Sequence, residues 1–428
     1  MSTGALLFLN ASQVMTCAGA PRARLGSEMA DAVVTSDTGV LVEGHTIAAT
    51  GTEAILRSEY PDATIIDCER GVLTPGFVDS HTHAIFGKAR YEEQELRAAG
   101  VPYMEIARRG GGIHASVRDL RMRSTDDLFA LAVPRLRALA ECGVTTVEVK
   151  SGYGLTLADE IRTLKVIQRL GAALPMRIVP TWLGAHEIPQ EFRDRPHGRN
   201  EYVDLLLHEM LPVIASDRLA RFADVFCEPG VFTVDESRTI LAAARAAGLG
   251  IKLHADELTT GGGAELAGEL HATSADHLAA VSDNGIAALA AGGTVATLLP
   301  GTMFFLGKAT QAPARRLIDA GVAVALATDF NPGTSPTANF PLILTLGVSQ
   351  LHLSVAEAFV AGTVNGAAAL GIANRVGQLA PGFSADLVLW PCSDVREIPY
   401  WYGSGRCRAS WTRGKPCHVH DLALTSGL

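Results

Sequence analysis

Apolar and polar residues alternate in two different ways along this chain. Residues 1–72 contain short runs with strand-like alternation, separated by glycine, asparagine and aspartate: "ALLFLN", "GVLVEGHTIAATG" and "ATIIDCERGVLTPG". From Gly377 onward the same pattern returns in "ADLVLWPCSD" and "RASWTRGKPC". Short alternating runs bounded by turn residues are typical of β-strands, so both ends of the chain are predicted to be rich in strands.

Between the two ends, apolar β-rich runs alternate with segments of helical periodicity. Eight such runs follow one another: "GFVDSHTH", "TTVEVKSG", "RIVPTWLGAH", "ADVFCEPG", "GIKLHADE", "ATSADH", "GTVATLLPG" and "VAVALATDFNP". The helical segments often begin at capping signals, as where Thr233 and Glu236 form a T-x-x-E capping box. Strands that alternate with helices pair in parallel, and eight such units suggest a (β/α)8 barrel with its active site at the carboxyl ends of the strands.

We therefore expect an α/β protein of two parts. Residues 73–373 are predicted to form the barrel, and residues 1–72 and 374–428 to pair into one small side domain. With 428 residues, of which 48% are hydrophobic and 19% charged, the chain can bury a large core and is predicted to be globular. Its net charge of -9 and its scattered lysines and arginines leave no basic stripe, so we expect no nucleic-acid partner.

The cysteines and the apolar stretches indicate where in the cell the protein is expected to act. The seven cysteines form no CxxC pair, and an odd number in a long chain is typical of free thiols in a reducing compartment, so we expect a cytoplasmic protein. The N-terminal "GALLFL" is too short for the core of a signal peptide. Residues 286–306 have the length of a membrane span, but Gly292, Gly293 and Pro300 interrupt them. A helix followed by a buried strand is the better interpretation, and no membrane contact is expected.

Histidines gather at the predicted strand ends. Five of the 13 histidines lie there, as does Asp329 on the eighth strand; the five are His81, His83, His186, His254 and His277. Any one of them is more simply explained as a hydrogen-bonded structural histidine. Six such groups on one rim of a barrel instead favour a site with a chemical role.

Four of these six residues have side chains suited to a divalent metal such as zinc, with water completing a five-coordinate site. The four are His81, His83, His254 and Asp329. Iron accepts the same ligand types. The spacing of His81 and His83 fits because residues i and i+2 of a strand point to one side.

The motifs around these residues resemble those of a known superfamily. "TPGFVDSHTH", the strand-five histidine and the strand-eight aspartate are similar to the amidohydrolase superfamily, whose fold is this barrel with a β-sandwich made from both termini. More narrowly, "HTHAIFGKARYEEQELR", "EVKSGYGL", "TWLGAHEIP", "KLHADE", "SADHL" and "ATDFNPGTSP" resemble the imidazolonepropionase family. The resemblance implies a hydrolase of the third step of L-histidine degradation. In that reaction a metal-bound hydroxide attacks the ring carbonyl of 4-imidazolone-5-propanoate and gives N-formimidoyl-L-glutamate.

Lys150 is a rival metal ligand, because some members of the superfamily bridge two metals with a carboxylated lysine. That lysine lies on strand four, whereas Lys150 lies on the second predicted strand. We therefore expect one divalent metal per chain, zinc or iron (Fe²⁺ or Fe³⁺). Lys150 is predicted to make an internal ion pair or hydrogen bond, and we assign it no catalytic role.

A proton must reach the ring nitrogen before it leaves, so a proton shuttle is required. Glu257 follows His254 by three residues in "HADE" and turns past the strand end toward the pocket, which makes it the first candidate and a substrate contact as well. His277 and Asp329 are the second candidates, acting on the metal-bound water. Acidic residues after a strand also cap helices, and Asp256 is predicted to do so.

The propionate of that substrate needs a cation. Arg90, in the loop after the first strand, can offer bidentate hydrogen bonds, although a surface salt bridge is the alternative. By resemblance, Arg90, Tyr153 and His186 contact the imidazolone, with Tyr153 stacking on the planar ring. The "NPGTSP" segment would present further contacts to the substrate, namely Asn331, Gly333 and Thr334. As bare sequence, this segment is only a turn.

Two other functions remain open from the sequence. One is a different amidohydrolase that deaminates a heterocyclic ring, since the same metal rim serves those reactions; the other is a non-catalytic metal-binding or scaffold barrel. Arg90 and "NPGTSP" favour a small-molecule substrate with a carboxylate, and a scaffold has no need of Glu257. We also expect a homodimer.

Overall fold

The computed structural model describes residues 4–101, 105–106 and 110–420, and a sheet of eight strands forms its centre. Each strand pairs in parallel with the next along the chain. They are β8 (Phe77–Asp79), β9 (Val144–Lys150), β10 (Arg177–Ala185), β11 (Phe222–Cys227), β12 (Gly250–Ala255), β13 (Ser274–His277), β14 (Val295–Leu298) and β15 (Val324–Leu326). Each lies within or overlaps one of the eight predicted runs, so the predicted α/β barrel is confirmed.

The barrel closes through the segments that follow its first and last strands. Thr82 forms a parallel bridge with Phe330, and the His83 N–H donates to the Phe330 carbonyl at 2.9 Å. The Asp329 N–H donates to the His81 carbonyl at 3.0 Å. Closure therefore places the end of β8 directly beside the end of β15.

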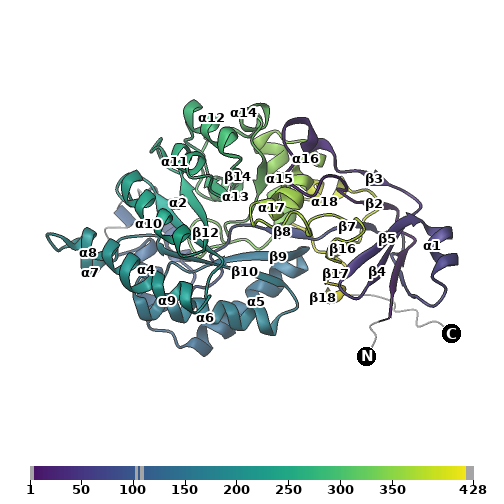
Figure 1. Cartoon of the computed structure of the whole chain (residues 1–428), viewed down its shortest axis with the longest axis horizontal. Helices are drawn as coiled ribbons and strands as arrows, with labels where there is room; N and C mark the ends of the chain where they lie inside the picture. Colours follow the sequence, from purple (N-terminus) through teal and green to yellow (C-terminus); the bar gives the residue numbers. More distant parts are fainter. Residues whose placement is uncertain (1–3, 102–104, 107–109, 421–428) are drawn as a thin grey trace.

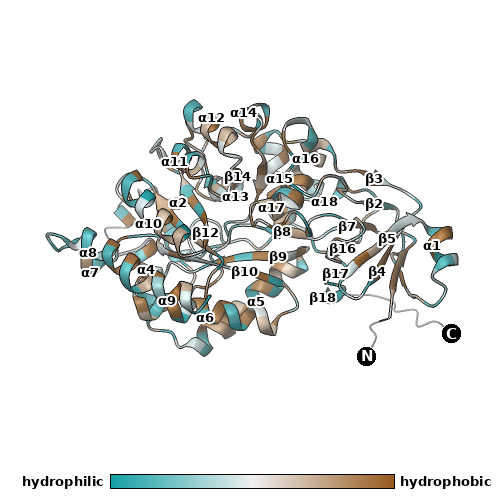
Figure 2. Cartoon of the chain, in the orientation of Figure 1, coloured by the Kyte–Doolittle hydropathy of each residue, from teal (hydrophilic) through white to brown (hydrophobic). Residues whose placement is uncertain are grey.

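Helices surround the strands, as Figure 1 shows. They are α2 (Tyr91–Ala98), α4 (Ile113–Arg121), α5 (Thr125–Glu141), α6 (Leu157–Ala173), α7 (Gln190–Arg193), α8 (Gly198–Leu205), α9 (Leu211–Ser216), α10 (Val234–Ala246), α11 (Gly263–Glu269), α12 (Asp283–Gly292), α13 (Pro300–Phe305), α14 (Ala314–Asp319), α15 (Phe340–Leu351), α16 (Val355–Gly362) and α17 (Val364–Ala368). Most carry both hydrophobic and hydrophilic residues (Figure 2), as expected of helices that cover a barrel. The predicted capping box is confirmed, because the Thr233 hydroxyl accepts the Glu236 N–H at the start of α10.

Two further sheets form the side domain, which lies beside the barrel at one end of the molecule (Figure 1). One comes from the N-terminal part alone: β5 (Thr46–Thr52), β4 (Thr38–Glu43), β1 (Leu6–Leu9) and β6 (Thr64–Asp67), with α1 (Glu53–Glu59) beside it. The other joins both parts of the chain: β18 (Lys415–Val419), β17 (Ala409–Thr412), β16 (Leu387–Trp390), β7 (Val72–Pro75), β2 (Gln13–Met15) and β3 (Val34–Thr35). Between them lies one apolar core that includes Phe8, Leu387 and Trp411. The predicted sandwich from both chain ends is therefore confirmed.

The side domain is packed against the barrel. The indole of Trp390, on β16, is buried, donates a hydrogen bond to the Thr74 hydroxyl at 2.9 Å and lies 5.6 Å from the ring of Phe77 on β8. A short helix, α18 (Glu397–Tyr400), contacts α15 of the barrel. These contacts fix the strand from which the first two histidines emerge.

The apolar stretch at residues 286–306 folds as predicted, into the end of α12, the buried strand β14 and α13. In the described part of the chain, no helix is both long enough and apolar enough to span a membrane. All seven cysteines carry free thiols, as predicted.

Candidate active site

The four residues predicted as metal ligands converge at one point of the barrel rim. His83 Nε2 lies 3.3 Å from His81 Nε2 and 3.4 Å from His254 Nε2. Asp329 Oδ1 lies 3.5 Å from the Nε2 atoms of both His81 and His83. Donor atoms around one zinc ion, each at about 2.0–2.1 Å from it, are themselves about 3.3 Å apart. The arrangement therefore fits a single metal ion.

In His81 and His254, a carboxylate lies beside the ring nitrogen that points away from the predicted metal position. His81 Nδ1 lies 2.6 Å from Asp276 Oδ2, and His254 Nδ1 lies 3.0 Å from Asp224 Oδ2. Burial, followed by the charge of Lys150, keeps the pKa of His81 well below its ordinary value, so this ring is neutral. A neutral imidazole whose Nδ1–H faces a carboxylate directs the lone pair of Nε2 toward the metal position.

Asp329 is held with one oxygen toward this position. The Thr302 hydroxyl donates to Asp329 Oδ2 at 2.6 Å, which leaves Oδ1 to face the histidines. Burial raises the pKa of Asp329 to about 6. Asp329 and His277 have φ angles of 51° and 80° in the left-handed region, which non-glycine residues seldom adopt. Such backbone strain clusters at functional sites.

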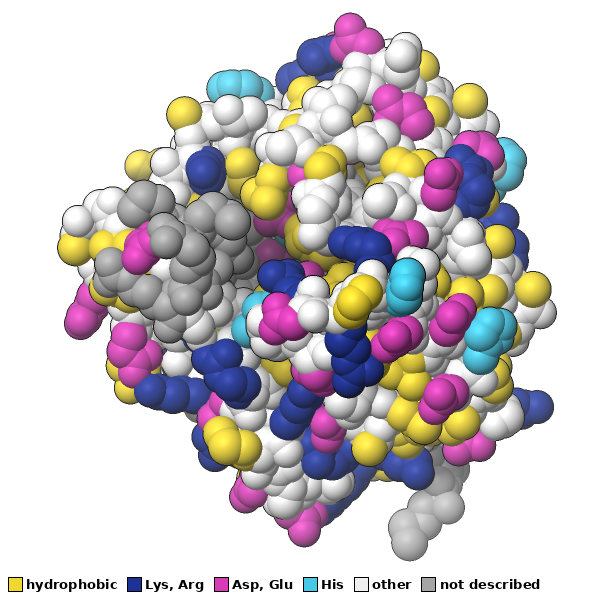
Figure 3. Space-filling model, turned by 90° about the vertical axis from the view of Figure 1, so that its left-hand side faces the viewer, with side chains coloured by type: hydrophobic (Ala, Val, Ile, Leu, Met, Phe, Trp, Pro, Cys, Tyr) yellow, Lys and Arg dark blue, Asp and Glu magenta, His cyan; other side chains and the backbone are white. Residues whose placement is uncertain are grey.

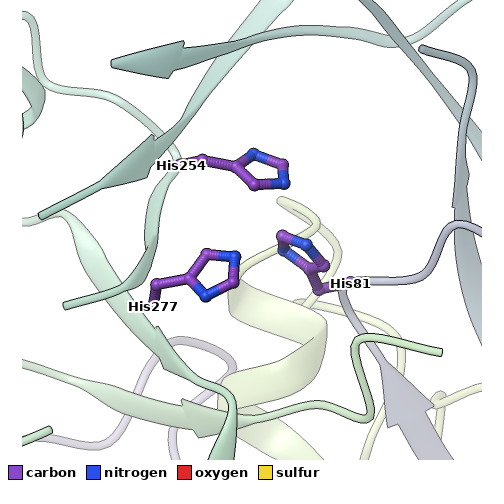
Figure 4. A group of neighbouring side chains, drawn as sticks. All are labelled: His81, His254 and His277. Atoms are coloured by element: carbon purple, nitrogen blue, oxygen red, sulfur yellow. The ribbon is translucent and has the colours of Figure 1, made fainter. Parts of the chain in front are cut away.

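Two predicted proton carriers lie beside the predicted metal ligands. Figure 4 shows the rings of His277, His81 and His254 turned toward one another, and the rings of His277 and His81 lie 5.4 Å apart. His277 Nε2 is 3.6 Å from Glu257 Oε2. Burial, with the negative charges of Asp329 and Glu228, raises the pKa of Glu257 to about 8. A carboxyl group with this pKa exchanges a proton near neutral pH, as a general acid or base must.

The turn that carries Glu257 is fixed by neighbouring acids. Glu228 accepts the backbone N–H groups of Glu257, Leu258 and Thr259. Asp256 accepts the N–H groups of three residues at the start of α11. The predicted helix cap is therefore confirmed, and Asp256 is engaged away from the metal position.

Tyr153 and His186 form an aromatic wall next to His83. The ring of His186 stacks on that of His83 at 5.0 Å with an interplanar angle of 17°, and the ring of Tyr153 lies 5.4 Å from His186. His186 Nδ1 is 3.0 Å from the Gly152 carbonyl oxygen. Gly152, with a φ of 107°, leaves no room for a side chain, because a Cβ there would lie 2.8 Å from the Leu183 carbonyl oxygen and 3.0 Å from His186 Nδ1.

The side chain of Arg90 is mostly buried on the same rim. Its backbone N–H donates to the Pro332 carbonyl at 3.1 Å, and its Nε lies 3.1 Å from Glu93 Oε1, with both side chains less than a tenth exposed. The guanidinium occupies the space that a Cβ on Gly333 would fill. Arg90 and Ser116 also line a cavity of about 160 Å³. The ion pair of Arg90 is therefore not the surface salt bridge that the sequence left open.

The three predicted substrate contacts in the "NPGTSP" segment, Asn331, Gly333 and Thr334, have different roles in the structure. The Asn331 amide holds the turn itself: Nδ2 donates to the Asp329 carbonyl at 2.7 Å, and Oδ1 accepts the N–H groups of Gly333 and Thr334. The Thr334 hydroxyl bonds to the same amide. Gly333 makes room for Arg90. These contacts place the segment next to the rim.

A layer of charged residues lies inside the barrel below the histidines. Lys150 Nζ is 2.7 Å from Glu148 Oε2 and 2.8 Å from Asp224 Oδ2, which confirms the predicted internal ion pair. Lys252 and Asp276 complete the layer. Asp224, Asp276 and Lys252 were not predicted from the sequence. A charge in the middle of an otherwise apolar strand, as in "ADVFC", was the signal that could have identified them.

The outer face at the barrel end of the molecule carries mixed charges. Figure 3 shows lysines and arginines interspersed with acidic residues on this face, without a broad patch of one sign. On this face, the described residues form no basic stripe.

Known proteins resemble this chain along its length. A family model described as "Amidohydrolase family" matches residues 105–417, and one described as "Imidazolonepropionase-like composite domain, bacteria" matches residues 39–63. The chain is 48% identical to the imidazolonepropionase of Symbiobacterium thermophilum over 96% of both proteins. It is 44% identical to that of Solibacter usitatus over 97% of this chain and 98% of the relative.

Solved structures share the fold. An adenosine deaminase from Xanthomonas campestris with bound zinc matches with a TM-score of 0.69 and 20% identity, covering 97% of this chain and 93% of the other. At this low sequence identity, the match shows only that the two proteins share the fold of barrel and side domain. The relatives that match at 44% and 48% identity over nearly their whole length are decisive, and this chain belongs to the imidazolonepropionase family of the amidohydrolases.

Proposed function

We propose that this chain hydrolyses the ring amide of 4-imidazolone-5-propanoate to N-formimidoyl-L-glutamate, the third step of L-histidine degradation. The observation that carries the proposal is the site geometry: four convergent metal-ligand atoms and a buried arginine share one rim of the barrel. Membership in the imidazolonepropionase family supports the same reaction.

In this proposal one divalent metal, zinc or iron, is held by His81, His83, His254 and Asp329. The donor set of three imidazoles and one carboxylate suits both metals, and the spacing of the donor atoms supports a single ion. When bound, such a metal lowers the pKa of water to about 7 and so supplies hydroxide at neutral pH. Lys150 is occupied by Glu148 and Asp224, so it is not proposed as a ligand.

Proton transfer is assigned to residues beside the metal ligands. Addition of water to the ring carbonyl forms a C–O bond. The C–N bond then breaks, and the leaving ring nitrogen takes up the proton that the attacking water has given up. Glu257 is proposed to carry this proton, because its pKa of about 8 lets it take up and release a proton near neutral pH. His277, which lies 3.6 Å from Glu257, and Asp329 assist it by acting on the attacking water.

The remaining residues are assigned to substrate binding. Arg90 is proposed to bind the propionate, while Tyr153 and His186 contact the flat ring and Glu257 its nitrogen. Asn331, Gly333 and Thr334 are proposed to contact the substrate through the loop that they form, with the Asn331 amide already engaged inside that loop. The buried guanidinium is the feature that favours a carboxylate substrate over an uncharged ring.

Three broader expectations accompany this function. The domains are proposed to comprise residues 1–72 with 374–428 and residues 73–373. The substrate is a small molecule with a carboxylate tail, and neither nucleic acid nor a membrane is proposed as a partner. The chain is also proposed to act in the cytoplasm as a homodimer.

Removal of the metal should abolish turnover. Purified protein is expected to contain one zinc or iron per chain by elemental analysis, and treatment with a chelator should stop the loss of 4-imidazolone-5-propanoate until metal is restored. Two metals per active chain would contradict the single-metal site. Undiminished hydrolysis by metal-free protein would contradict the mechanism itself.

Substitution of Glu257 should separate proton transfer from metal binding. Glu257→Gln is expected to retain the metal but to lower the rate by at least about 10²-fold, the lower end for general acid–base catalysis. Glu269→Gln, which changes an exposed glutamate of α11, serves as the matched control. Wild-type turnover in the Glu257 variant would remove this residue from the mechanism.

Substitution of Arg90 should weaken substrate binding rather than chemistry. Arg90→Ala is expected to raise KM for 4-imidazolone-5-propanoate at least about 10-fold with little change in kcat, because the propionate lies away from the reacting carbon. An imidazolone that lacks the propionate should react equally well with both proteins. An unchanged KM, or much faster turnover of a neutral nucleobase by the wild type, would favour the alternative of a heterocycle deaminase.

A further inference from the structure

The layer of charged residues below the histidines is unusual for a barrel interior. Such interiors are ordinarily filled by valine, isoleucine and leucine. Here five fully buried ionisable side chains contact one another inside the barrel: Glu148, Lys150, Asp224, Lys252 and Asp276. They come from β9, β11, β12 and β13, so the contacts between Lys150, Asp224 and Asp276 cross the barrel rather than join neighbouring strands.

Lys150 and Lys252 tie these carboxylates together. Lys150 Nζ donates to Asp224 Oδ2 at 2.8 Å and lies 3.6 Å from Asp276 Oδ2. Lys252 Nζ lies 3.0 Å from Glu148 Oε1 and 3.6 Å from the same oxygen of Asp276. Both lysines therefore reach Asp276. Lys150 also binds Glu148 and Asp224 closely. Lys252 also binds Glu148.

Lys252 also reaches the strand that carries the first ligand. Its ammonium group donates to the Ser80 carbonyl at 2.8 Å, one residue before His81. The Ser274 hydroxyl donates to Asp276 Oδ1 at 2.6 Å, which leaves Oδ2 for His81 Nδ1. The backbone and the ring of His81 are thus both fixed by groups that Lys252 contacts.

Asp224 plays the same part for His254. Its Oδ1 accepts the backbone N–H of His254 at 3.1 Å, while its Oδ2 lies 3.0 Å from the ring Nδ1 of that residue. His254 Nδ1 faces Asp224 Oδ2 at that distance without the alignment of a hydrogen bond, and His83 Nδ1 is buried without a hydrogen-bond partner among the described residues. The charged layer therefore orients two of the three proposed histidine ligands.

We infer that Lys150 and Lys252 are positioning residues for the metal site: they hold Asp224 and Asp276 in the places from which these acids orient His254 and His81. The inference rests on the metal site of the proposed function. Neither lysine touches the substrate, and neither is a metal ligand. Groups that orient metal ligands in this way typically change metal affinity by about 10–100-fold when they are lost.

The test measures metal affinity rather than turnover. Lys252→Met and Lys150→Met proteins, first freed of metal, are titrated with zinc in competition with a coloured chelator, and each is expected to bind zinc at least about 10-fold more weakly than the wild type. Lys165→Met changes an exposed lysine of α6 and should bind zinc as the wild type does. Wild-type affinity in both core variants would overturn the inference. A wild type that binds no zinc would instead contradict the proposed function.

A double-mutant cycle separates positioning from a general loss of packing. If Lys252 acts through Asp276, the Lys252→Met change should weaken zinc binding much less when Asp276→Asn is already present than in the wild type. Equal losses in the two backgrounds would overturn the inference. Should Lys252→Met not fold, Lys252→Gln keeps an N–H donor for the Ser80 carbonyl and enters the same cycle, with circular dichroism of the metal-free proteins as the check of folding.

Discussion

The carboxylate of Asp276 faces His81 Nδ1 on one side and the ammonium groups of Lys150 and Lys252 on the other. Moving an unpaired ion from water into a low-dielectric interior costs on the order of 20 kcal/mol in the idealised limit, so these groups are stable only together. The two lysines and three acids of the layer leave one excess negative charge, and Asp329 adds a second when ionised. One divalent cation at the rim would balance both. Because the fold buries this excess negative charge, it favours the binding of a divalent cation at the rim.

The topology explains how residues far apart in sequence share the site. All barrel strands run in parallel, so their carboxyl ends lie on one rim, and closure through Thr82 and Phe330 brings the first strand back to the last. Asp329 and His81 become neighbours in this way although 248 positions separate them along the chain. The loops beyond these ends then add Arg90 from one side and the turn of Asn331 from the other. The proposed metal ligands lie at rigid strand ends and the proposed substrate contacts lie in loops, as is usual in this architecture.

The barrel fold and the position of the candidate metal site could be predicted from the sequence alone, because both follow from hydrophobic periodicity and residue type. The alternation of strands and helices predicted all eight barrel strands, and strand-end positions predicted the convergence of His81, His83, His254 and Asp329. Side-chain pairing could not be predicted in this way. Whether Arg90 is exposed or buried depends on Glu93 and on the space left by Gly333, and the turn at Asn331 engages its amide within the loop. The role of Asp224 and Asp276 could not be predicted, because only the closed barrel brings Lys150 and Lys252 beside them.

The most direct test is a crystal structure of zinc-loaded protein with a non-reactive, carboxylate-bearing analogue of the substrate, with the metal located by anomalous scattering. We expect one peak per chain, about 2.0–2.2 Å from the Nε2 atoms of three histidines and from Asp329 Oδ1, with the carboxylate of the analogue against Arg90. The three histidines are His81, His83 and His254. A second peak among Glu148, Asp224 and Asp276, a metal bound without Asp329, or an analogue carboxylate remote from Arg90 would contradict it.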